Sequence, residues 1–385
     1  MIYFDWTATT KPRKEVIDIY NKVIDMYWAN PSSAYTLGLK ASQLFDKAKE
    51  NLKEALKVKD KDYDVLYTAN ATEANNLAIF GICNNYLKEA NKYRIITTKI
   101  EHPSVYNIYK RLENLGFDCI YLDVDNNGLI DLNQLREVIN KDTLLVSIMY
   151  VNNVIGTIEP INEVIDILKD YPRCKLHIDA VQAIGKIDID VDLNKVDLIT
   201  ISSHKLEGLK GTATLIYKKN INITPHLHGA SQQQGLVPGT IDLAGAVACT
   251  KAITLAIQEA KNHQEMINKL YNHLIERLKE IDIIELNSNT FRSSKSIVSI
   301  YVKNHRAETV MHYLESKDIY VSISSACSSK LKTIDRTLYA ITKDNDRSIS
   351  SIRISLSYHN TISEIDTLVN TLKEYLGKWY DVWIW

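Results

Sequence analysis

The feature that most constrains the fold is an alternation of short apolar runs and amphipathic stretches between about residues 60 and 220. The apolar runs are rich in β-branched residues and have the length of buried strands. Helical patterns lie between them, most clearly over residues 71–88 and 103–115. Strands that alternate with helices form a mostly parallel sheet covered on both faces, so we expect an α/β fold. Its seven strands are expected at residues 65–68, 94–98, 119–122, 144–149, 176–179, 198–201 and 214–217.

Helical periodicity also flanks this region. Apolar residues at three- and four-residue spacing from Leu37 to Ala55 predict one long amphipathic helix before the sheet. Residues 245–279 predict another, long enough to link two domains, and strand and helix patterns alternate again from residue 296 to 375. We therefore expect a large domain over residues 16–255 and a small α+β domain over residues 256–385, with residues 1–15 as an N-terminal segment of the small domain.

Composition excludes several classes of protein. The 46 basic and 47 acidic side chains of the 385 residues nearly cancel, so no bulk field favours direct nucleic-acid binding or an anionic membrane. No apolar run approaches the roughly 18 residues of a membrane span, and the first residues lack the basic and apolar regions of a secretory signal. We expect a cytoplasmic protein. Five cysteines without CxxC spacing argue against disulfides or a zinc site, and no metal site is expected.

Two predicted strands end in residues suited to an aldehyde cofactor. Lys205 follows the strand at 198–201, and a desolvated lysine can form a Schiff base. Asp179 ends the strand at 176–179, where a carboxylate can stabilise a protonated pyridine nitrogen, and Gln182 can donate to a ring oxygen. Ligands of open α/β sheets bind at these carboxyl ends of strands. Taken singly, a solvated surface lysine and a helix-capping aspartate explain the same residues.

Two further strand ends offer groups for an anion and for proton transfer. Ala71 and Thr72 begin a predicted helix whose N-terminal N–H groups can bind a phosphate, and Ser202 and His204 add donors beside Lys205. His102 follows the strand at 94–98, where an imidazole can stack on a ring and carry protons. A plain helix cap at residues 71–72 and an ordinary loop histidine remain the alternatives.

Cys327 and Arg353 lie in the C-terminal part. Cys327 is in a polar stretch typical of a mobile surface loop, near two lysines that favour a thiolate, whereas the other four cysteines lie in patterns that predict burial or beside Pro172. Arg353 lies in an apolar strand pattern, where a guanidinium can bind a substrate carboxylate in bidentate fashion. A surface arginine is equally consistent with this pattern.

Read together, the chain resembles the cysteine desulfurases, class V members of the fold-type I pyridoxal-phosphate (PLP) enzymes. The resemblance covers nearly the whole chain, and its Ser-Ala-Cys-Ser stretch is similar to the long-loop group that serves iron–sulfur cluster assembly and tRNA thiolation. The matching segments are residues 3–10, 30–33, 71–78, 101–102, 151–153, 177–182, 203–205, 238–240, 325–327 and 351–353.

The resemblance implies a role for each candidate residue. Lys205 forms the Schiff base with PLP, Asp179 pairs with the pyridinium nitrogen, Gln182 contacts the ring oxygen and His102 stacks on the ring. Asn153 and Arg353 hold the substrate carboxylate, and Cys327 takes the sulfur of L-cysteine as a persulfide and passes it to an acceptor protein. The phosphate contacts come from Ala71, Thr72, Ser202 and His204, and from Thr240 of the second subunit of a homodimer.

The sequence departs from the family pattern at three places. Tyr35 replaces a histidine, Val154 replaces a glutamate, and residues 234–238 replace an arginine-rich stretch. A PLP lyase for selenocysteine or cysteine sulfinate, an aminotransferase, and a non-catalytic protein of this fold remain alternatives. Cys327 argues against simple transamination, which needs no loop thiol.

Overall fold

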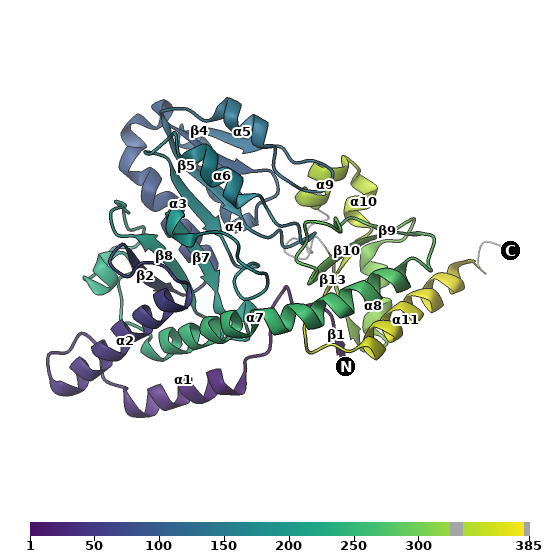
Figure 1. Cartoon of the computed structure of the whole chain (residues 1–385), viewed down its shortest axis with the longest axis horizontal. Helices are drawn as coiled ribbons and strands as arrows, with labels where there is room; N and C mark the ends of the chain where they lie inside the picture. Colours follow the sequence, from purple (N-terminus) through teal and green to yellow (C-terminus); the bar gives the residue numbers. More distant parts are fainter. Residues whose placement is uncertain (324–333, 381–385) are drawn as a thin grey trace.

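The computed structural model describes residues 1–323 and 334–380, and its largest sheet confirms the predicted α/β class. The strand order is β2-β8-β7-β6-β5-β3-β4 (Figure 1). Strands β3 to β7 run parallel, but β8 is antiparallel to both of its neighbours. The strands are β2 (Tyr63–Thr68), β3 (Arg94–Thr98), β4 (Asp118–Leu122), β5 (Thr143–Met149), β6 (Lys175–Asp179), β7 (Leu198–Ser202) and β8 (Ala213–Lys218).

Helices cover both faces of this sheet, as the alternating pattern requires. On one face α3 (Ala71–Cys83) and α4 (Pro103–Asn114) bury an apolar core against the strands. On the other face lie α2 (Thr36–Ala55), α5 (Leu132–Val138), α6 (Ile161–Leu168) and the first half of α7 (Leu243–Leu278). The helix α1 (Lys14–Met26) packs on α7. The expected helix over residues 71–88 is an α-helix only as far as Cys83, and residues 84–88 continue it as part of a 3-10 segment that kinks at Glu89.

The C-terminal part has a second sheet and a second apolar core. Its antiparallel strands, in the order β12-β13-β10-β9, pack against α8 (Ala307–Glu315), α11 (Ile362–Tyr380) and the second half of α7. Short helices α9 (Arg336–Thr342) and α10 (Asn345–Ile349) precede β13. The strands are β9 (Ile284–Leu286), β10 (Ile297–Val302), β12 (Ser322–Ile323) and β13 (Ser351–Ser355).

Two segments distant in sequence join the two cores. Near the N-terminus, β1 (Ile2–Tyr3) pairs with β11 (Ile319–Tyr320), and Phe4 is buried in the second core. The 36-residue α7 extends from the large sheet to the second core (Figure 1). The domain boundaries after residues 15 and 255 stay a prediction.

The segment that departs from the family pattern covers one edge of the large sheet. Gln233 accepts a hydrogen bond from the Tyr67 N–H (2.7 Å) and donates one to the Tyr67 carbonyl (2.9 Å), as a neighbouring strand would. Gln234 donates to Asp64 (2.8 Å). Both glutamines have positive φ, so the chain turns sharply here. Gln233, directly before the segment that departs from the family pattern, therefore satisfies backbone groups of an edge strand that would otherwise be open to other chains.

No helix within residues 1–323 and 334–380 combines the length and the apolar character that crossing a membrane requires.

Candidate functional site

The predicted cofactor residues of the large sheet gather at one edge. Strands β3, β5, β6 and β7 point the same way, and β2 does too, because β8 is antiparallel to both β2 and β7. Their carboxyl ends therefore lie together. The candidates that follow these ends are Ala71 and Thr72 after β2, His102 after β3, Asn153 after β5, Asp179 and Gln182 at the end of β6, and Ser202, His204 and Lys205 at the end of β7.

Asp179 is a buried carboxylate, with 6% of its surface exposed. It accepts hydrogen bonds from the Asn75 side chain (3.0 Å) and from the Val181 N–H (3.1 Å), both uncharged donors. Across the described ranges no ion pair of Asp179 is found. A buried carboxylate is costly without a positive partner, so this residue suits a cationic ring nitrogen.

His102 is the N-cap of α4, and its Nδ1 accepts a hydrogen bond from the Ser104 N–H (3.1 Å). Nδ1 also lies 2.8 Å from the Ser104 hydroxyl. Burial lowers the pKa of His102; Asp179 opposes this shift, while Lys205 and Arg336 reinforce it. The ring is thus neutral at neutral pH, and the accepting Nδ1 leaves its proton on Nε2.

Lys205 ends a short turn, Ser203–Lys205, directly after β7. Its ammonium donates to the carbonyls of Thr7 (2.7 Å) and Ala8 (2.6 Å) in the N-terminal segment. Gln182, which is buried, donates to the same Thr7 carbonyl (3.2 Å). Lys205 and Gln182 therefore meet at one backbone oxygen, on the side of the sheet where Asp179 ends β6.

Glu207 anchors the turn that carries Lys205. Its carboxylate forms an ion pair with Arg13 (2.8 Å), accepts from the Tyr358 hydroxyl (2.6 Å) and contacts His359. Its φ of 56° is unusual for a residue with a side chain. These contacts tie the lysine turn to the N-terminal segment and to the C-terminal part of the chain.

Two of the predicted phosphate ligands lie at a pocket beside this turn. Ser202 and His204 line it together with Asn70, the N-cap of α3, and with Lys210 and Thr212. Burial lowers the pKa of His204 to about 4, with help from Lys205, Lys186 and Lys210. Ala71 and Thr72 form the first turn of α3, whose N-terminus attracts anions. Thr240 lies in the exposed segment before α7 and does not line this pocket.

The predicted substrate residues Asn153 and Arg353 are in direct contact. The buried Arg353 donates to the Asn153 carbonyl (2.9 Å) and forms an ion pair with Asp5 (2.9 Å). Its Nε has no hydrogen-bond partner among the described residues. The structure thus leaves this guanidinium one buried donor to spare, although it also holds a counter-ion, Asp5, that the sequence did not indicate.

The departures from the family pattern lie outside this set of contacts. Tyr35 is 57% exposed at the start of α2. Val154 is buried in a small apolar cluster with Ile155, Leu338 and Ile341. A valine at this position therefore packs α9 against the large domain, where a glutamate would need a partner.

Cys327 lies outside the described residues. The other four cysteines are described, and none is paired. Burial raises the pKa of the Cys119, Cys174 and Cys249 thiols to about 12, and raises that of Cys83 further still. These four thiols are protonated and poor nucleophiles at neutral pH.

Three contributors were missed from the sequence. Asn75, one turn into α3, bridges Asp179 and the Ser104 hydroxyl (2.9 Å). Ser104 in turn fixes His102. Lys186, one helical turn beyond Gln182 in spacing, donates to the Gln182 side-chain oxygen (2.6 Å). Asn75 and Lys186 stand four residues after Ala71 and Gln182, and this spacing is the signal that could have indicated them.

Comparisons with known proteins agree with this geometry. The aminotransferase class-V family matches residues 2–368. The chain is 36% identical over 378 residues to a NifS/IcsS protein homolog of Lactobacillus delbrueckii subsp. bulgaricus, which covers 97% of each chain. It is 35% identical over 381 residues to the cysteine desulfurase IscS of Dictyoglomus turgidum, covering 98% of this chain and 95% of that one.

A solved structure of a NifS-like protein superposes with a TM-score of 0.90 at 32% identity, covering 98% of this chain and 99% of the other. The family comprises PLP-dependent enzymes of fold type I, which confirms the resemblance noted in the sequence. The chain therefore belongs to the class V aminotransferase family, as a relative of the NifS and IscS cysteine desulfurases.

Proposed function

We propose that this protein is a PLP-dependent cysteine desulfurase that converts L-cysteine to L-alanine and takes up the sulfur as a persulfide on Cys327. The observation that carries the proposal is the convergence of Lys205, Gln182 and Asp179 at the ends of β6 and β7. The family membership and the desulfurase names of the relatives support the same chemistry.

The residues at the strand ends fit PLP by their chemistry. Asp179 offers a buried carboxylate to a protonated ring nitrogen, and Gln182 offers an N–H to a ring oxygen. Donors for a phosphate come from two places: Ser202 and His204 line a pocket, and Ala71 and Thr72 form the first turn of α3. Lys205 offers the amine. When bound, PLP supplies an electron sink that makes the substrate Cα–H acidic and weakens the bond from Cβ to sulfur.

The protein side chains supply binding and proton transfer. Arg353 and Asn153 would hold the substrate carboxylate, with the spare Nε donor of Arg353 as one contact. His102 is neutral and fixed through Nδ1, so its Nε2 can exchange a proton at the reacting centre. The amine of Lys205 is the other group that would move the proton from the substrate Cα.

The sulfur step needs a nucleophilic thiol. The Cys327 thiolate would attack the substrate sulfur; the Cβ–S bond breaks, an S–S bond forms, and Cβ gains a proton to give alanine. No external oxidant is required. Cys327 is proposed because burial keeps the four cysteines of the described part protonated.

The destination of the sulfur and the assembly are also proposals. The resemblance to the long-loop group favours an acceptor of iron–sulfur cluster assembly or tRNA thiolation. The same resemblance favours a homodimer in which Thr240 of the second subunit reaches the phosphate. A cytoplasmic location rests on the sequence, and cell fractionation would test it.

Spectroscopy and turnover test the proposal together. With PLP, wild type is expected to show a visible absorbance band that Lys205→Ala lacks, and to release alanine and sulfide from L-cysteine with a thiol reductant. Cys327→Ala should keep the band and lose sulfide release, whereas Cys119→Ala, which removes a partly exposed but protonated thiol, should keep both. Full desulfuration by Cys327→Ala would refute the persulfide route.

A further inference from the structure

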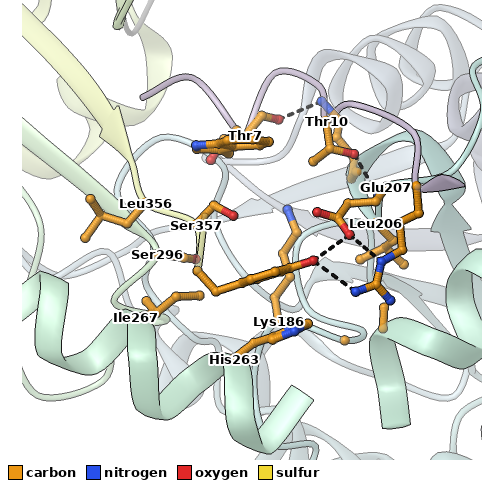
Figure 2. A pocket seen from close by; sticks show the side chains of 16 residues that line it. Thr7, Thr10, Lys186, Leu206, Glu207, His263, Ile267, Ser296, Leu356 and Ser357 are labelled. Carbon is orange, nitrogen blue, oxygen red and sulfur yellow. Dashed lines mark hydrogen bonds and ion pairs between the residues drawn. The ribbon is translucent and has the colours of Figure 1, made fainter. Parts of the chain in front are cut away.

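Lys186 lines a pocket that is also lined by Lys205 of the proposed cofactor site. Figure 2 shows its side chain extending into this pocket, which is also lined by Thr7, Lys205, His263 and Leu356. The pocket thus lies where the N-terminal segment, α7 and the C-terminal part meet the lysine turn. Lys186 follows Gln182 by four residues in the turns after β6.

A chain of hydrogen bonds connects Lys186 to Lys205. The Lys186 ammonium donates to the Gln182 side-chain oxygen (2.6 Å), and the Gln182 amide nitrogen donates to the Thr7 carbonyl (3.2 Å). The Lys205 ammonium donates to that same carbonyl (2.7 Å). The first link lies within the turns after β6, and the other two join side chains of the large sheet's strand ends to the N-terminal segment.

This series of hydrogen bonds determines the orientation of the Gln182 amide. An amide can face a neighbour with its oxygen or with its NH₂ group, and only the hydrogen-bond network decides which. In its protonated form Lys186 has donors alone, so it then requires the Gln182 oxygen on its side. A carbonyl oxygen can only accept hydrogen bonds, so the Thr7 carbonyl requires the NH₂ group of Gln182 on the opposite side. Both partners select the same orientation.

We propose that Lys186 is a positioning residue, which holds the Gln182 amide with its N–H groups toward Lys205 and the ring oxygen of PLP. This inference rests on the proposed function for the identity of the ligand, but the orientation itself is a property of the protein. Without Lys186 only the Thr7 carbonyl (3.2 Å) holds the amide, so it rotates more readily, and the rotated orientation presents an oxygen to the ring oxygen, which is repulsive.

The environment of Lys186 argues against a merely space-filling role. Burial lowers its pKa to about 7, and the nearby charges of Lys205 and Arg353 lower it in the same direction. Placing an amine among these groups costs folding free energy that an apolar side chain of similar length would avoid. The hydrogen bond to Gln182 accounts for a polar side chain at this position.

A double-mutant cycle tests the proposal. PLP affinity would be measured by absorbance titration of the apoprotein for wild type, Lys186→Met, Gln182→Ala and the double variant. Loss of the orienting bond is expected to weaken PLP binding about tenfold in Lys186→Met. In the Gln182→Ala background the same change should matter by less than twofold, because no amide remains to be oriented. Equal losses in both backgrounds, or no loss in either, would overturn the proposal.

Two further variants separate positioning from stability. Lys53→Met removes a buried lysine that is paired with Asp60, and should lower the melting temperature without changing PLP affinity. Lys186→Arg keeps a donor-only cation and should recover part of the lost affinity.

A measurement without PLP keeps the inference distinct from the proposed function. In the apoprotein, the unfolding free energies of the four cycle members should show coupling between Lys186 and Gln182, and additive values would contradict the contact. If wild type showed no visible band with PLP, the proposed function would fail whatever this cycle gave.

Discussion

At the scale of single residues, the buried Glu101 beside His102 makes a testable contribution to stability. Burial raises the pKa of Glu101 to about 8; hydrogen bonds from the Met149 N–H and the Thr98 hydroxyl oppose this shift, and Asp179 adds to it. The folded protein thus holds a proton that the unfolded chain releases near pH 4.5. This contribution is complete below about pH 4.5 and is lost as the pH rises through about 8.

Glu101→Gln should remove this dependence. Between pH 5 and 8.5 the unfolding free energy of wild type is expected to fall by roughly 2–4 kcal/mol more than that of the variant. Urea denaturation at several pH values measures the difference, and the exposed Glu50→Gln serves as the control. Parallel pH profiles for wild type and Glu101→Gln would show that Glu101 is ionised in the folded state.

The candidate residues that could be predicted from the sequence are those that directly follow a predicted strand. Asp179 and Lys205 follow apolar runs, so their place at one sheet edge could be predicted, and the structure brings them there. Asn75, Lys186 and Asp5 could not be predicted in the same way. The partners of Asn75 and Asp5 are distant in sequence, and the partner of Lys186 depends on the backbone conformation of the turns after β6. Hydrophobic periodicity predicts neither long-range contacts nor turn conformations.

At the scale of elements, α9 is attached to the large domain through its first residue. Arg336 donates to the Lys99 carbonyl (2.9 Å) and to the Glu101 carbonyl, and its guanidinium lies 3.6 Å from the centre of the Tyr106 ring. These contacts join α9 to the turn that precedes His102. The remaining attachment is the apolar cluster of Leu338 and Ile341 with Val154.

Arg336→Ala should therefore loosen α9 without unfolding the protein. Charge-assisted hydrogen bonds contribute about 1.5–3 kcal/mol each, so the amides of Arg336–Thr342 should exchange at least tenfold faster. Hydrogen–deuterium exchange with mass spectrometry measures this rate. Arg277→Ala on α7, which removes a surface ion pair with Glu280, should leave α9 unchanged. Unchanged exchange in Arg336→Ala would mean that the apolar cluster alone holds the helix.

Helices and strands could be predicted where the hydrophobic pattern of the segment is typical of one kind of element. The inner strands of the large sheet follow from β-branched apolar runs, since a strand buried on both faces has little choice of residue, and the partly exposed edge strand β4 was also expected. The antiparallel direction of β8 could not be predicted, because an apolar run reads the same either way along the sheet. The change from α-helix to 3-10 helix after Cys83 could not be predicted either, because residues 84–88 keep a helical pattern in both forms.

At the scale of the whole molecule, a long exposed apolar stretch bears on the assembly. Between α1 and the first turn of α2, Trp28 is 73% exposed, and Tyr35, Leu37 and Leu39 are about half exposed. Large apolar side chains that gather on a surface mark contacts with other molecules. We expect the second copy of the proposed homodimer to cover these side chains and to bring its Thr240 to the phosphate site.

Trp28→Asp should accordingly convert a dimer into monomers of 43.9 kDa, because a buried carboxylate without a partner opposes association. Sedimentation velocity at micromolar concentration measures the change, and PLP retention during gel filtration should fall with it, since the contact from Thr240 is lost. Phe291→Asp places the same charge at a side chain that is 70% exposed outside this stretch, and should leave both the dimer and PLP retention intact. A wild-type protein that sediments as a monomer yet retains PLP would show that one chain builds the whole site.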